Sequence, residues 1–336
     1  MRRPQLAGSL VLRHYVLSIS AGAALLAGCG GSQPPIGAPG AMPQTTALAT
    51  RADRGKSWML PEAKSEDLLY VTNYSGVSVL TYPESKRVGV LKGFFSAAGE
   101  CVDQYGNVFI GNEKPVGVYE YAHGGSKRIA KFLTKHVGAI GCAVEPVTGN
   151  LAVTGSSSSV NIFERGRKQP LVITDPKMFF NIFCTYDDKG DLFVGGSSNA
   201  SGGLRLAEPP AGARKFAGIS IGPTIDPTQN IQWDGAHLAA LSFVKHGTKK
   251  KIAIAQLAID GTQATQVGST PLERPAYIIL QCFITKGTVI LPNWSLRQGQ
   301  HDDVLFYHYP KGGRPFVQLT NDMTDPRGAV VSFAGK

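Results

Sequence analysis

Short runs of apolar residues, separated by turn signals, recur along the chain from residue 58 onward. Glycine and proline are frequent in this part, and no long amphipathic helix pattern is visible. One repeat shows the pattern well, with runs at 99–103, 107–111, 118–121 and 129–132. Runs of this length, bounded by glycine-containing turns, predict short antiparallel strands. The hydrophobic pattern therefore predicts an all-β protein.

The four-run unit repeats along the chain, and further copies begin near residues 141, 182, 231 and 281. The two ends hold one divided copy: 68–71, 77–80 and 88–91 lack a first strand, and 328–332 is a first strand with nothing after it. Such repeats predict a six-bladed β-propeller with four-stranded blades. The C-terminal strand is expected to pair with the N-terminal blade, which removes an exposed sheet edge. Seven blades are the alternative, if the longer fourth and fifth repeats contain extra strands.

The N-terminus has a different pattern. Arg2, Arg3 and Arg13 precede a run of apolar and small residues at 15–26, which is too short to span a hydrocarbon core of about 30 Å comfortably. A positive front end and a short apolar core are typical of a signal peptide. The run ends in Leu-Ala-Gly-Cys at 26–29, which resembles the lipobox of bacterial lipoproteins. We therefore expect a signal peptide over 1–28 and lipid on the thiol of Cys29.

Residues 29–57 are rich in Gly, Pro, Ala, Ser, Gln and Thr. A segment of this composition buries too little surface to offset its ordering entropy, so we expect a flexible tether before a propeller domain over 58–336. Gly30 follows the cysteine, where lipoproteins retained in the inner membrane carry aspartate. By this resemblance the chain is exported and anchored in the cell envelope, in the outer membrane of a two-membrane cell.

The first-strand motif combines Gly99, Cys101 and Asp103 with Gly106 and the run Asn-Val-Phe-Ile at 107–110. It resembles repeats of the NHL and gluconolactonase-like (SMP-30) propellers, and residues 58–336 also resemble secreted propeller lipoproteins of soil bacteria. The resemblance implies the fold. It implies little about function, because propellers have many unrelated activities.

The net charge and the positions of the cysteines bear on which partners and metals are expected. The chain carries a net charge of +10, but export and the lack of a recognition motif argue against nucleic acid. Cys101, Cys142, Cys184 and Cys282 occupy the same slot of successive first strands. We expect these slots to lie too far apart for a disulfide, which needs Cα atoms within about 7 Å, so the four thiols are interpreted as small buried residues near the axis. A ring of thiols that binds a soft metal is the alternative.

In a propeller, the loops before the first strands and those joining second to third strands gather on one face around the channel. These loops hold aromatics, amides and charges of both signs, typical of a sugar or peptide surface. The candidate binding residues are Glu100, His136, Phe180, Asn181, Asn230, Tyr277, Asn293, Trp294, Asp325 and Arg327. Gly-Ile-Ser-Ile-Gly at 218–222 matches the hydrolase pattern G-x-S-x-G, but it falls between strands without the helix that this motif requires.

Two functions follow. The first is a membrane-tethered, extracytoplasmic binding or scaffold module, monomeric and without a required cofactor, whose ligand is a small molecule, a glycan or a protein. The second is a metal-dependent lactonase or related hydrolase, as the gluconolactonase resemblance implies, with a divalent cation at the channel mouth. For that alternative, Glu100, Asn181, Asn230 and Asp325 supply the oxygen ligands that Ca²⁺ prefers.

Overall fold

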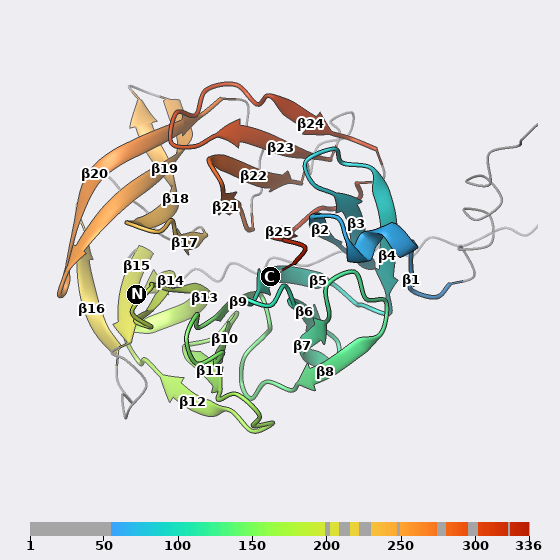
Figure 1. Ribbon diagram of the computed structural model, residues 1–336. Coiled ribbons are helices and arrows are strands. Elements are labelled where there is room, and N and C mark those ends of the chain that lie inside the picture. The colour runs from blue at the N-terminus through green and yellow to red at the C-terminus, as the bar shows by residue number, and fades with distance from the viewer. Residues whose placement is uncertain are drawn as a thin grey trace, which may run out of the picture. The chain divides into compact units, whose positions relative to one another are not determined.

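The computed structural model is all-β and has the arrangement of a β-propeller, with small sheets placed radially around a central axis (Figure 1). It describes residues 55–198, 202–207, 216–221, 230–246, 249–273, 280–294, 302–321 and 323–335. A 3-10 helix at Pro61–Lys64 (η1) accompanies the strands. No helix in the described ranges combines the length and the apolar character needed to cross a membrane.

The strands form five hydrogen-bonded sheets. The first contains, in spatial order, β25 (Gly328–Ser332), β2 (Leu68–Asn73), β3 (Gly76–Thr81), β4 (Arg87–Lys92) and β1 (Trp58–Met59). The second contains β5 (Ala97–Val102), β6 (Val108–Glu113), β7 (Val116–Tyr121) and β8 (Arg128–Phe132). The third contains β9 (Gly141–Val144), β10 (Leu151–Thr154), β11 (Ser159–Phe163) and β12 (Leu171–Thr174). The last four-stranded sheet contains β21 (Phe283–Thr285), β22 (Thr288–Asn293), β23 (Asp303–His308) and β24 (Val317–Leu319).

The remaining sheet has eight strands. It consists of two four-stranded meanders: β13 (Met178–Tyr186), β14 (Leu192–Ser198), β15 (Gly202–Ala207) and β16 (Phe216–Ile221), then β17 (Ile231–Trp233), β18 (Leu238–His246), β19 (Lys249–Asp260) and β20 (Gln263–Leu272). A short parallel pairing joins their outermost strands, with Ser220 opposite Gln263 and Ile221 opposite Ala264. By hydrogen bonding the propeller therefore has five sheets, where the repeats predict six separate ones. The join covers two strand edges that would otherwise remain open.

The predicted ring closure is confirmed. Strand β25 pairs antiparallel with β2, from Leu68 opposite Ser332 to Thr72 opposite Gly328. The C-terminal strand thus becomes the innermost strand of the first sheet. On the outer edge of that sheet, Trp58 and Met59 add a short fifth strand against β4, which the repeat pattern does not predict.

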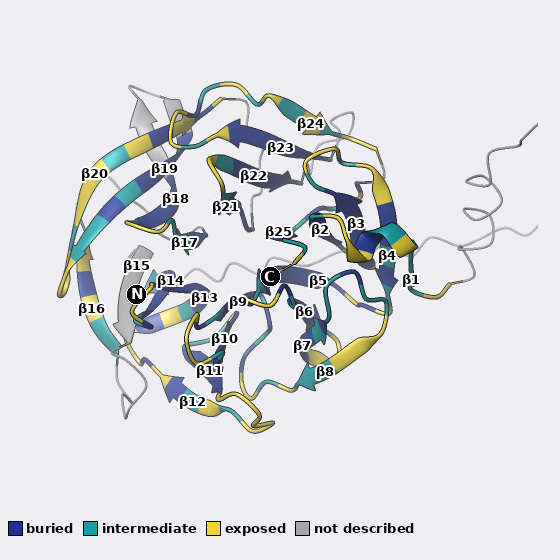
Figure 2. Cartoon of the chain, in the orientation of Figure 1, coloured by how far each residue is buried: buried dark blue, intermediate teal, exposed yellow. Residues whose placement is uncertain are grey.

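The core lies between neighbouring sheets, because the inner and middle strands are buried on both faces (Figure 2). Tyr70, Ile110 and Val330 belong to one such apolar cluster, contributed by the first two sheets. Within the described strands, most of the exposed positions belong to three outermost ones, β8, β16 and β20 (Figure 2). Burial on both faces explains why inner-strand sequences are continuously apolar rather than alternating.

Near the axis the innermost strands of the second and third sheets touch through their backbones. The N–H of Gly99 donates to the carbonyl oxygen of Ile140 over 2.7 Å. A Cβ atom built on Gly99 would lie 2.2 Å from that oxygen, so only glycine fits at this contact.

Gly99→Ala is therefore expected to lower the free energy of unfolding by about 3 kcal/mol, the upper end of what overpacking costs, since the opposing atom is backbone. Urea unfolding measures the change. Gly138→Ala is the matched control, because its Cβ would meet nothing closer than 3.8 Å. Equal stability of the two variants would contradict the close approach.

The close approach of these two innermost strands contradicts one prediction made from the sequence. Cys101 and Cys142 form a disulfide, and their Cα atoms lie 5.7 Å apart. The prediction that these slots are too far apart is thus wrong for this pair, because the glycine contact two residues away draws the two inner strands together. Cys184 and Cys282 are free and buried, as expected for small interior residues, and burial raises the pKa of each thiol to about 12.

Candidate functional site

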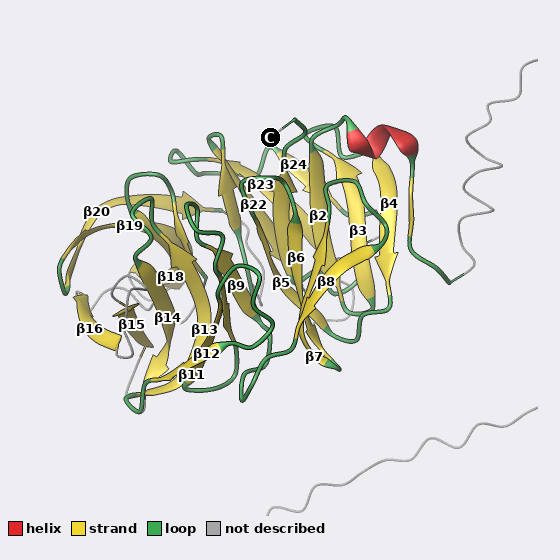
Figure 3. Ribbon diagram, turned by 60° about the horizontal axis from the view of Figure 1, so that its bottom comes forward, coloured by secondary structure: helices red, strands yellow, loops and turns green. Residues whose placement is uncertain are grey.

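The strands run between two faces of the propeller (Figure 3). We call the face with the turns between first and second strands and between third and fourth strands the turn face. The turns at 103–107, 145–150 and 187–191 lie there, as does the C-terminal end. The opposite side, with the loops before each innermost strand and those joining second to third strands, is the loop face. Most of the candidate residues from the sequence lie on the loop face.

Two adjoining cavities occupy the axial region. The larger, which we call the mouth pocket, has a volume of about 580 Å³ and is bordered by residues of the turn face. The smaller, the channel pocket, has a volume of about 210 Å³ and extends along the inner strands. Both are lined by Val102, Val144, Pro146, Asp188, Trp233 and Phe283. The shared lining makes the two cavities one continuous site that opens on the turn face.

The mouth pocket has aromatic walls. Its rings come from several sheets and are Tyr105, Phe109, Phe132, Phe163, Trp233, Phe283 and Phe333. Phe132 contacts both Phe109 and Phe163, with ring centroids 6.1 and 5.2 Å apart. The indole N–H of Trp233 donates to Asp188 Oδ2 over 3.0 Å, and the indole stacks on Phe193. These contacts hold the indole in place beside a carboxylate.

The fold places an acidic residue at the end of successive innermost strands: Asp103 and Glu145 line the mouth pocket, and Asp187 lines the channel pocket. Asp103 accepts hydrogen bonds from the backbone N–H groups of Tyr105 and Asn107 and from the Asn107 amide. Glu145 accepts from Val147 and Thr148 in the next turn, and Asp187 accepts from Lys189 and Asp191. Each carboxylate stabilises a tight turn, as Asp commonly does. The donors to Asp103 and Glu145 are backbone, amide and hydroxyl groups, so none of these contacts is an ion pair.

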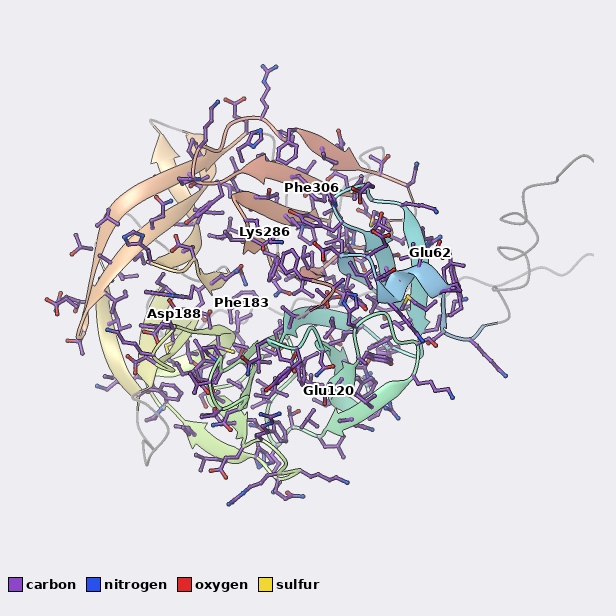
Figure 4. All side chains as sticks on the ribbon, viewed as in Figure 1. Glu62, Glu120, Phe183, Asp188, Lys286 and Phe306 are labelled. Atoms are coloured by element: carbon purple, nitrogen blue, oxygen red, sulfur yellow. A yellow bond between two sulfur atoms is a disulfide. The ribbon has the colours of Figure 1, made fainter. Side chains whose placement is uncertain are left out.

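The charge of the mouth pocket is opposite to that of the chain. Five acidic residues line it, Asp103, Glu120, Glu145, Glu164 and Asp188, against one basic residue, Arg165. Glu164 forms an ion pair with Arg167, and the Arg165 guanidinium lies over the Tyr105 ring at 5.5 Å. Burial raises the pKa of Glu120, and the negative charge of Asp103 raises it further. Figure 4 labels Glu120 and Asp188, which come from different sheets.

The channel pocket is lined in part by Glu100, Asn230 and Gln281. The Gln281 amide accepts from the Glu100 N–H over 2.7 Å and donates to the Glu100 carbonyl, which ties the last sheet to the second. The Glu100 carboxyl is fully buried, and neither oxygen has a hydrogen-bond partner. Burial raises the pKa of this carboxyl well above the ordinary range. The backbone N–H of Val330 lowers the pKa by a smaller amount, although it forms no hydrogen bond with the carboxyl. Burial therefore favours the protonated form of the Glu100 carboxyl over its charged form.

The four candidate metal ligands do not line one cavity. Glu100 and Asn230 line the channel pocket, where Asn230 Oδ1 accepts from the Cys282 thiol over 3.3 Å. Asn181 is buried with both amide atoms unpartnered, and Asp325 binds Arg327 on the loop face. Within the described ranges, no group of three or more His, Cys, Asp or Glu is placed to hold a metal ion. Two of the four candidate ligands are Asn, which is not one of these four residue types, so the metal site stays a prediction.

Three candidates from the loop face do come together. Arg327 donates to Ser96 Oγ over 2.6 Å and to Asp325 Oδ2 over 3.1 Å. Its guanidinium also lies over the rings of Tyr74 and Trp294, at 5.1 and 5.4 Å. Arg327 therefore connects the loop before β25 to the neighbouring sheets, and we interpret it as a latch at the ring closure.

The other candidates are dispersed. Asn293 is buried and donates to Asp303, Phe180 packs on Phe179, and His136 is exposed with a φ of 58°. Cys29 and Tyr277 lie outside the described residues. Glu120, Asp188 and Trp233 are not among the candidates from the sequence. Lys189 and Gly190 indicate a turn in the sequence, but nothing there shows that Asp188 beside it borders a cavity.

Comparisons with known proteins support the fold alone. No family model matches the chain. No curated protein matches it either. Among solved structures, a protein of unknown function from Bacteroides caccae is similar at 13% identity and a TM-score of 0.57, covering 80% of this chain and 99% of its own. Kuenenia stuttgartiensis hydrazine synthase is similar at 14% identity and a TM-score of 0.48, with 63% of each chain covered.

Proposed function

We propose that the chain is a membrane-tethered, extracytoplasmic binding module whose ligand occupies the mouth pocket. The observation that carries the proposal is this cavity of about 580 Å³, which has aromatic walls and carboxylates at its border. Its volume falls within the range of about 300–1,000 Å³ that is usual for small-molecule sites. A binding module needs no acid–base pair and no metal. The metal-dependent lactonase stays a prediction.

The lining favours a small organic cation as ligand. Aromatic faces attract cations through their quadrupole, and the surrounding carboxylates add a favourable charge. Asp103, Glu120 and Asp188 face the pocket without an ion-pair partner among the described residues. A cation bound there would meet Trp233 and Asp188 together, because the two side chains are already joined by a hydrogen bond.

Export and lipid anchoring are part of the proposal. The apolar run at 15–26 and the Leu-Ala-Gly-Cys sequence at 26–29 support lipidation of Cys29. The Cys101–Cys142 disulfide is independent support, because disulfides persist in oxidising compartments and are rare in the cytosol. We also infer that the propeller has six blades, with the eight-stranded sheet counted as two because each of its meanders has four strands.

The proposal predicts that the protein binds phenethylammonium, and that it binds benzyl alcohol, a neutral aromatic probe, more weakly. Trp233→Ala is expected to weaken binding of the cation by about two- to thirtyfold, because a cation–π contact contributes about 0.5–2 kcal/mol. Asp188→Asn keeps an acceptor for the indole N–H but removes the charge. It should therefore weaken binding of the cation and leave the affinity for the alcohol unchanged. Isothermal titration calorimetry measures both ligands.

Val147→Ala is the matched control, because Val147 is 71% exposed on the turn face and does not line the mouth pocket. Equal affinity for the cation in Asp188→Asn and wild type would rule out the charge selectivity. No binding of either probe would leave the mouth pocket without a ligand and argue against the proposed site.

A further inference from the structure

The loop face carries exposed apolar side chains from consecutive parts of the ring. Three belong to the first two sheets and two lie at the start of the sheets that follow: Tyr74 at 42%, Phe95 at 42%, Val116 at 39%, Leu133 at 52% and Phe179 at 58% exposed. Tyr74 and Phe95 adjoin, with ring centroids 5.7 Å apart. Phe179 packs on its chain neighbour Phe180, with ring centroids 4.3 Å apart. Exposed apolar side chains gathered on one face mark an interaction surface.

The exposed charges of the same loops are basic. Lys114, Lys135 and Lys177 are all exposed, and Lys114 Nζ lies 5.0 Å from the Phe95 ring centroid. The acidic residues of these loops are withdrawn from the surface: Glu113 is half-buried, and Asp175 is buried with its Oδ1 accepting from the Lys177 N–H. The loop face thus combines aromatic and aliphatic side chains with lysines, the opposite of the acidic mouth pocket.

The N-terminal part of the chain joins the propeller at this face. Ser57 Oγ accepts from the Lys92 N–H over 2.8 Å, and Lys92 is the last residue of β4, directly before the loop that contains Phe95. Strand β1 then runs antiparallel to β4, away from the loop face. Cys29 precedes Gly55 by 26 positions, counted as 55 − 29. The chain that leads from Cys29 therefore enters the domain at the edge of the apolar and basic surface.

We propose that the loop face lies against an anionic lipid bilayer, which orients the mouth pocket away from the membrane. The inference rests on the proposed lipid anchor at Cys29. Aromatic and aliphatic side chains with flanking lysines suit the headgroup region, where the apolar groups enter the interface and the lysines attract anionic lipids. A protein partner fits less well, because it would have to bind at the point where the anchored chain leaves the domain. Ligand would then reach the pocket from the side that faces the solvent.

The test uses the full lipidated chain in vesicles of phosphatidylethanolamine and phosphatidylglycerol that contain a spin-labelled lipid as quencher. A fluorophore is attached through Ser75→Cys on the loop face or through Val147→Cys on the turn face, since both positions are exposed. The native thiols do not interfere, because Cys101 and Cys142 are bonded and Cys184 and Cys282 are buried. We expect strong quenching at position 75 and none at position 147. Equal quenching at both positions overturns the proposal.

A second test reverses the charge of the lysines on the loop face. Lys114→Glu, Lys135→Glu and Lys177→Glu together, or vesicles without phosphatidylglycerol, should abolish the difference between the two labels. Quenching at position 75 that persists in both cases overturns the role of the lysines. Mass spectrometry of the N-terminal peptide reports the lipid on Cys29 separately. Absence of the lipid contradicts the anchor, whereas a lipidated chain with equal quenching contradicts only the docking of the loop face.

Discussion

Removal of the Cys101–Cys142 disulfide is expected to lower the free energy of unfolding by about 4 kcal/mol. The bond joins innermost strands of neighbouring sheets across a sequence separation of 41 residues. Closing a loop of this length removes conformational entropy from the unfolded chain, which gives the estimate of about 4 kcal/mol. Urea unfolding of Cys101→Ala/Cys142→Ala beside the wild type, both without reductant, measures the change.

Cys184→Ala is the control for the loss of a buried sulfur, because Cys184 occupies the same slot without a bond. The double variant should lose clearly more stability than twice the control does. Reductant should destabilise the wild type and leave the double variant unchanged. If the wild type and the double variant unfold at the same urea concentration, the inner strands do not carry the bond.

Glu100→Gln is expected to change how stability depends on pH. The buried Glu100 carboxyl has a raised pKa in the folded chain, so the folded state keeps a proton that the unfolded state releases above the ordinary Glu pKa of about 4.3. The free energy of unfolding therefore falls as the pH rises above about 4.3 until the folded pKa is reached, by about 1.4 kcal/mol per pH unit. Gln has a similar shape and does not titrate, so the variant should lack this slope and be more stable than wild type at the upper end of the window.

Urea midpoints measured from pH 4 to 9 give both curves, and the exposed Glu84→Gln is the control that should keep the wild-type slope. The Gln281 bridge remains in Glu100→Gln, because it contacts only the Glu100 backbone. Parallel curves for wild type and Glu100→Gln would show that the carboxyl does not remain protonated in the folded state.

Much of the fold could be predicted from the sequence because the repeat is regular. The incomplete first and last copies predicted the pairing of β25 with β2, and the register bears this out. The join between β16 and β20 could not be predicted, since it depends on which outer edges meet in space. The disulfide was missed for a similar reason. Spacing shows that Cys101 and Cys142 occupy equivalent slots, but only the Gly99–Ile140 backbone contact shows how closely the strands approach.

The candidate site was less predictable. The sequence directed attention to the loop face, where Asp325, Arg327 and Trp294 do come together, yet the cavities open on the turn face. Asp103 was recognised as part of the turn motif, and its carboxylate does stabilise that turn. A pocket arises from the space between sheets. For example, Glu120 and Trp233 come from different sheets and are 113 positions apart in sequence, counted as 233 − 120, so no local pattern relates them.

A crystal structure of the protein with bound phenethylammonium tests the central claim most directly. We expect density for the aromatic ring against Trp233 and for the ammonium group beside Asp188 or Glu120, inside the mouth pocket. Density for the cation on the loop face, with the mouth pocket filled only by solvent at saturating ligand, would contradict the assignment of the turn face as the binding face.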